Sequence, residues 1–175
     1  MRRRSVGFMT LIVIGLAVFT LFQLIGINKP DSQKHDAVKL LHQVSVFQLE
    51  LVNKQLHEAL NAATTDELNM LKQTVYTAHY THERLSMAVG QKELPPLQSV
   101  SDLLEYIMRL QIGGNRQLSD KELSVFHEVR DSFAELHGIY EALLSSKGEV
   151  ITSQNRLLQR TEQAIGHIFE QKGFK

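Results

Sequence analysis

Cysteine is missing from the whole sequence of 175 residues. Its absence excludes disulfide bonds, thiolate metal sites and cysteine nucleophiles, as well as attachment of a lipid to an N-terminal cysteine. Stability must therefore come from packing. The sequence also has no Asn-x-Ser/Thr acceptor, so nothing indicates a eukaryotic secretory route, and we expect a bacterial envelope protein.

An excess of either charge is missing as well, because 19 basic residues balance 19 acidic residues. No basic stripe of the kind that neutralises phosphates is present, so we expect no nucleic-acid partner. Enzyme motifs are equally scarce: there is no Gly-x-Ser-x-Gly, no glycine-rich phosphate loop and no dinucleotide fingerprint. We therefore expect a protein that is not an enzyme and has no cofactor.

What the chain does have is a basic stub followed by a long uncharged segment. Arg2, Arg3 and Arg4 precede a run from Val6 to Ile27 that contains no charge. A helix of this length is roughly 33 Å long, which matches a hydrocarbon core of roughly 30 Å. Positive flanks stay in the cytoplasm, so this pattern predicts a single-pass plasma-membrane protein with its C-terminal part outside.

A cleaved signal peptide and a buried core helix are the alternatives for this segment. Signal peptides have shorter apolar cores, followed by small residues at the cleavage site, and no Ala-x-Ala-like sequence follows Ile27. Core helices are rarely apolar all round over six turns. We therefore predict four segments: a cytoplasmic stub at residues 1–5, a membrane anchor at 6–27, a juxtamembrane stalk at 28–37 and an extracytoplasmic bundle at 38–175.

Helical periodicity dominates the rest of the chain and predicts an all-α fold. We expect an antiparallel bundle of four long helices, with one short helix packed across an end. The expected helices cover, approximately, residues 31–62, 64–89, 99–112 (the short one), 119–143 and 146–172. A continuous helix through Gly148 is the alternative to separate fourth and fifth helices.

Two of these helices have distinctive apolar stripes. The first helix has a main stripe and a second stripe, so it predicts contact with more than one neighbour. The second helix has a seam with coiled-coil-like spacing, which suits packing within the chain better than packing against another chain. The main stripe comprises Val38, Leu41, Leu49, Val52, Leu56 and Leu60, the second stripe Leu40, Val44, Phe47 and Leu51, and the seam Leu68, Leu71, Val75, Ala78, His82, Leu85 and Val89.

Local signals predict where helices begin and end. Thr64 with Glu67 and Ser119 with Glu122 both have capping-box spacing. Ser146 with Glu149 is a further candidate cap for the last helix. Gly90 is placed to end the second helix.

The candidate metal ligands are two histidines and a glutamate of the second helix. His79, His82 and Glu83 lie within about one turn of each other, and imidazole with carboxylate suits zinc. The alternative interpretation places His82 half-buried in the seam and His79 toward water. No second pair of ligands is identifiable, so the three residues are weak candidates. A second group, His127, His137 and His167, lies near apolar faces and raises a pH-sensing hypothesis.

The leading functional hypothesis is a non-enzymatic, membrane-anchored bundle that binds another envelope or membrane protein. Tyr76, Tyr80, Tyr106 and Tyr140 are either core residues or contacts for that partner. A homo-oligomer is possible, although the anchor has no small-xxx-small pattern to bring two copies together in the membrane. The alternative is a ligand-, metal- or pH-responsive sensory module coupled to a separate membrane protein.

Overall fold

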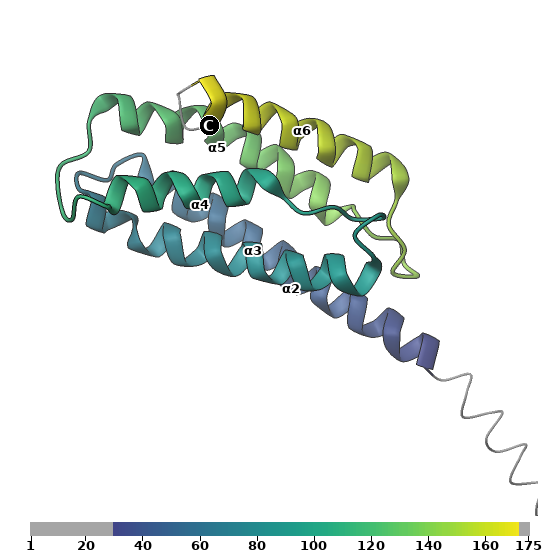
Figure 1. Ribbon diagram of the computed structural model, residues 1–175. Coiled ribbons are helices and arrows are strands. Elements are labelled where there is room, and N and C mark those ends of the chain that lie inside the picture. Colours follow the sequence, from purple (N-terminus) through teal and green to yellow (C-terminus); the bar gives the residue numbers. More distant parts are fainter. Residues whose placement is uncertain (1–29, 172–175) are drawn as a thin grey trace, which may run out of the picture. The chain divides into compact units, whose positions relative to one another are not determined.

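The computed structural model describes residues 30–171 of the chain, with side chains described from Lys34 onward. This part is all-α, as predicted, and Figure 1 shows its helices. Their bounds are α2 Pro30–Ala59, the 3₁₀ turn η1 Thr65–Leu68, α3 Asn69–Val89, α4 Gln98–Gln111, α5 Asp120–Glu141 and α6 Thr152–Gln171. No helix in this described part is long and apolar enough to cross a membrane. The stub and anchor predicted at 1–27 lie outside the described residues.

The chain divides into two compact units, residues 1–37 and 38–175, and the helical bundle is the second of these. Consecutive helices of the bundle run in opposite directions (Figure 1). The α3, α4, α5 and α6 helices are joined in a chain of contacts, α3 against α4, α4 against α6 and α6 against α5.

The short helix α4 does not pack across an end of the bundle, so that part of the fold prediction is wrong. It lies alongside α3 and α6 instead. With 14 residues it is about 21 Å long, which is enough to follow its neighbours. Its buried apolar residues share one face of the helix, and this face packs into the bundle. The buried apolar side chains of α4 are Val100, Leu103, Tyr106, Ile107 and Leu110.

The core contains most of the predicted apolar positions. In α3 and η1 the seam from Leu68 to Leu85 is buried within this single chain, as the intramolecular interpretation predicts. The α2 helix buries only its main stripe, through residues such as Leu49, Val52 and Leu56. Leu40, Val44 and Phe47 of its second stripe stay exposed. No segment described in this chain covers them, although the width of the apolar face predicted a second neighbour.

The capping box at Ser119 is confirmed. The Ser119 side chain accepts a hydrogen bond from the Glu122 amide, and Glu122 Oε2 accepts one from the Ser119 amide at 2.8 Å. Arg116 strengthens the box, because its Nη1 donates to Glu122 Oε2 at 2.9 Å. The guanidinium accordingly lowers the pKa of Glu122 to about 2. Asp120 and Glu122 also place negative charge at the N-terminus of α5.

The capping box predicted at Thr64 is wrong in its geometry. The Thr64 side chain caps no amide and donates instead to Glu67 Oε1 at 3.0 Å, while Glu67 Oε2 accepts from the Ala63 amide at 3.1 Å. A long-range contact is the reason. Thr65 N donates to Arg116 O at 2.9 Å, and Leu118 N donates to Ala63 O at 3.0 Å. The extended backbone around Thr64 therefore follows the 116–118 segment, and α3 begins only at Asn69.

The turn between α5 and α6 also differs from the prediction. Its serine contact is Ser145 rather than Ser146, because Ser145 Oγ accepts from the amides of Lys147 and Glu149, each at 3.2 Å. Gly148 has a φ of 80°, which favours glycine and interrupts any helix. The continuous helix through Gly148 is therefore wrong, and α6 begins at Thr152.

Candidate functional site

The predicted metal candidate His82 lies in the core, with 1% of its surface exposed. Its Nε2 is 2.9 Å from the carbonyl oxygen of Pro95, and its Nδ1 is 2.8 Å from the Tyr140 hydroxyl. A carbonyl only accepts, so these partners assign the proton to Nε2 and make Nδ1 the acceptor from Tyr140. Burial lowers the pKa of His82 to about 4, against the opposing effect of the Pro95 carbonyl. The imidazole is therefore neutral at pH 7.

His42 extends this buried cluster to α2. Its Nε2 lies 2.8 Å from the carbonyl oxygen of Tyr140, and its ring stacks on the Tyr140 ring at a centroid distance of 5.5 Å. Burial lowers the pKa of His42 and raises that of the Tyr140 hydroxyl. The cluster thus links α2, α3, α5 and the loop before α4. Its polar groups hold helices together and leave neither nitrogen of His82 available to a metal.

His79 and Glu83 face one another on α3, but His82 does not join them. His79 Nε2 is 3.5 Å from Glu83 Oε1, and His79 Nδ1 is 3.2 Å from Ser101 Oγ of α4. Within residues 30–171 there is no group of three His, Cys, Asp or Glu residues that could hold a metal ion. The second group of histidines lies on α5 and α6, where His127 and His167 are exposed and His137 is half-buried.

A carboxylate that the sequence analysis did not identify, Glu162 of α6, lies at the N-terminus of α4. Its Oε2 accepts a hydrogen bond from the Ser99 amide at 3.0 Å, and its Oε1 accepts one from the Ser99 hydroxyl. Burial raises the pKa of Glu162, and the neighbouring Asp102 adds to this effect. Beside the pair is a small groove of about 240 Å³ between α4 and α6. Because 63 residues separate Ser99 from Glu162, no local motif signals the contact.

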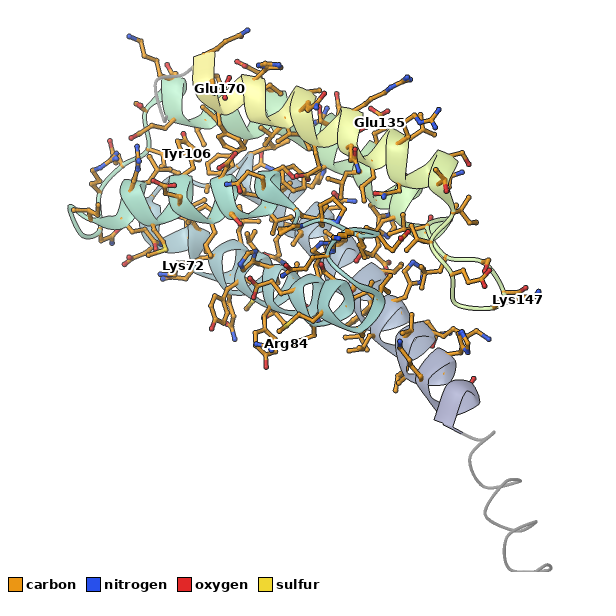
Figure 2. The ribbon with its side chains drawn as sticks, turned by 45° about the vertical axis from the view of Figure 1, so that its right-hand side comes forward. Lys72, Arg84, Tyr106, Glu135, Lys147 and Glu170 are labelled. Atoms are coloured by element: carbon orange, nitrogen blue, oxygen red, sulfur yellow. The ribbon has the colours of Figure 1, made fainter. Side chains whose placement is uncertain are left out.

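Exposed aromatic and apolar side chains gather on the outer side of α3. Tyr76 is 59% exposed, Tyr80 is 48% exposed and Met87 is 62% exposed. The guanidinium of Arg84 lies over the Tyr80 ring, 4.6 Å from its centroid, and Figure 2 shows Arg84 on the side of α3 away from the bundle. We call Tyr76, Tyr80, Arg84 and Met87 the α3 face. The other two tyrosines, Tyr106 and Tyr140, are buried. Two of the four tyrosines therefore belong to the core and two lie on the surface.

A second exposed apolar stripe lies on α2 and comprises Leu40, Val44, Phe47 and the half-buried Leu51. We call these four residues the α2 seam. A groove of about 450 Å³ borders the seam at Phe47, and residues from α2 and from the end of α5 line it, among them Lys39, Glu50 and Glu141. Both sides of this groove belong to the 38–175 unit.

Comparison of the chain with protein-family models, with curated proteins and with solved structures gave no match.

Proposed function

We propose that this protein is a single-pass plasma-membrane protein whose extracytoplasmic helical bundle binds another envelope protein, in a non-enzymatic role of assembly or modulation. The anchor is the uncharged segment 6–27, and Arg2, Arg3 and Arg4 keep the N-terminus in the cytoplasm.

The observation that carries the binding proposal is the α3 face. Tyrosine and arginine are enriched among the residues that dominate binding energies, because they combine a large apolar area with a polar group. Here Tyr80 and Arg84 are already stacked, which reduces the side-chain entropy that they lose on binding. The core side of the same helix is fully used within the chain, from Leu71 to Leu85. The outer side is therefore available to a partner.

Site-specific photo-cross-linking in cells tests this proposal. A photoreactive phenylalanine analogue at Tyr76 or Tyr80 of the full chain should give an adduct with one particular envelope protein. The same analogue at the exposed Gln159 of α6 is the matched control and should not give it. Replacing Tyr80 and Arg84 with alanine should abolish capture from position 76, whereas Gln73→Ala, also exposed on α3, should leave it intact. Equal capture from all positions would contradict the proposal.

A ligand-responsive sensory module is the competing proposal, and the groove beside Glu162 is the feature a small cationic group would use. Thermal unfolding of residues 28–175 separates the two. A rise of many degrees with added zinc would favour the sensor. The interaction proposal predicts no effect of zinc.

A further inference from the structure

We propose that the α2 seam pairs with the α2 seam of a second copy of this chain, as a short parallel coiled coil directly above the membrane. This inference rests on the proposed membrane tether. It assigns to the seam a partner different from the protein that the α3 face binds.

The spacing of the seam is the first observation. Leu40, Val44, Phe47 and Leu51 follow one another at intervals of four, three and four residues, which is the repeat of a two-stranded coiled coil. Leu40 is 62% exposed and Phe47 is 53% exposed, although α2 is continuous and well packed on its other side. An exposed stripe with this period fits another helix, and two identical stripes fit one another in register.

The polar residues around the seam permit this pairing. In a parallel coiled coil, the residue that precedes a seam position on one helix lies opposite the residue that follows the next seam position on the partner helix. Gln43 would then face Gln48 of the second copy, and Glu50 would face Gln55, so that no like charges meet. Beyond Leu51 the next seam positions are Lys54 and Glu58, both exposed. A symmetric parallel pair would set Lys54 against Lys54 and Glu58 against Glu58 of the second copy, so the pairing ends after Leu51.

The position of the seam explains the direction of pairing. The predicted anchor precedes Pro30, so it is connected to the N-terminal end of α2. An antiparallel pair would place its two anchors at opposite ends, and they would not enter the same bilayer. A parallel pair places both anchors at one end and the four seam layers at equal heights. Membrane confinement therefore selects the parallel arrangement.

The size of the seam explains why it needs the membrane. Four side chains per copy, over about two heptads, bury much less than the roughly 1,200–2,000 Å² of a stable interface between free proteins. Tethering converts association into a nearly intramolecular event at an effective concentration of up to about millimolar. The anchor itself has no close-packing glycine pattern, so the pairing contacts fall on α2.

Disulfide trapping of the full chain in membranes tests the pairing, because the native chain contains no cysteine. Val44→Cys lies in the seam, where a symmetric pair brings the two sulfurs together, whereas Glu50→Cys is exposed on the same helix beside the seam. After mild oxidation, the yield of covalent dimer should be at least several-fold higher with Val44→Cys than with Glu50→Cys. Equal yields, or a Val44→Cys adduct with a different protein, would overturn the inference.

In the second measurement, a further substitution adds a charged residue to the Val44→Cys chain, and the dimer yield is compared again. Phe47→Glu places two carboxylates against each other in the seam and should reduce the dimer yield at least several-fold. Gln43→Glu adds the same charge beside the seam and should leave the yield unchanged. Both positions are exposed, so neither change should affect folding.

Alkaline carbonate extraction of the same membranes separates the two proposals. If the chain stays in the pellet but Val44→Cys gives no dimer, the pairing is wrong and the proposed tether stands. If the chain is extracted, the tether is wrong, and membrane-directed pairing is overturned with it.

Discussion

The buried imidazole of His82 makes the stability of the bundle depend on pH. Burial lowers its pKa from the ordinary value of 6.5 to about 4. Between these values the unfolded chain binds a proton at this site and the folded chain does not. The free energy of unfolding must therefore fall as the pH falls through this window, and the contribution is fully present above pH 6.5. The full difference corresponds to roughly 3 kcal/mol, at about 1.36 kcal/mol per pH unit.

Urea unfolding of residues 28–175 between pH 7.5 and 4 measures this effect. The free energy of unfolding should fall less steeply with acid in His82→Gln than in the wild type. The exposed His57→Gln is the control and should keep the wild-type slope. His42, whose pKa burial also lowers, contributes in the same direction to all three chains. Identical slopes in wild type and His82→Gln would show that the buried imidazole does not control the acid sensitivity.

Residue types alone do not separate core from surface in this chain. Tyr76, Tyr80, Tyr106 and Tyr140 all lie on amphipathic helices, and only the packing of neighbouring helices decides which are covered. The spacing of His82 predicts a place in the α3 seam, and His82 is buried there. The spacing does not indicate its hydrogen bonds, because Tyr140 is 58 residues away and comes from another helix.

Helix ends show the same limit of local signals. Ser119 and Glu122 form their capping box because both partners lie within four residues and the Ser119 amide donates to Glu122 Oε2. Thr64 and Glu67 have the same spacing, but the backbone at 63–65 is already hydrogen bonded to 116–118. The sequence predicted the order, approximate lengths and antiparallel course of the helices. It missed the side-by-side placement of α4, which depends on contacts between distant segments.

The difference between the helix ends at Ser119 and Thr64 gives a prediction for the stability of the two helices. Ser119→Ala should reduce the free energy of unfolding by about 1 kcal/mol, within a range of about 0.5–2 kcal/mol, because the Glu122 amide at the start of α5 loses its side-chain acceptor. Thr64→Ala should cost clearly less, because its side chain caps no amide. Urea unfolding at pH 7.5 provides both values. Equal losses would mean that both threonine and serine act as caps.

Glu162 gives a second prediction, which concerns the stability of α4. Its carboxylate stabilises the N-terminus of α4 from across the bundle, so Glu162→Ala should leave the buried Ser99 amide without an acceptor. We expect a loss of about 1–3 kcal/mol in the free energy of unfolding. The neighbouring Gln163→Ala is the control, because Gln163 is exposed on the same helix. The account of α4 would be wrong if both variants were equally stable.

At the scale of the whole molecule, the described bundle buries its own core, and among residues 38–171 it leaves the α3 face and the α2 seam exposed. The α3 face and the α2 seam lie on different helices, and each has a period and chemistry suited to a protein partner. The proposed anchor would account for both surfaces, because a tethered bundle would meet its partners repeatedly in one plane. The proposed function accordingly rests on the exposed surface of the bundle.

Membrane topology is the most direct test of this account. Single cysteines at Ser5 and at Ser146 of the exposed α5–α6 turn would be treated, in intact cells, with a maleimide that does not cross the membrane. The account predicts that the cysteine at 146 is labelled at once, that the cysteine at 5 is labelled only after lysis, and that both occur on one uncleaved chain. Protection of the cysteine at 146 in intact cells, or a mature chain that begins near Asn28, would contradict it.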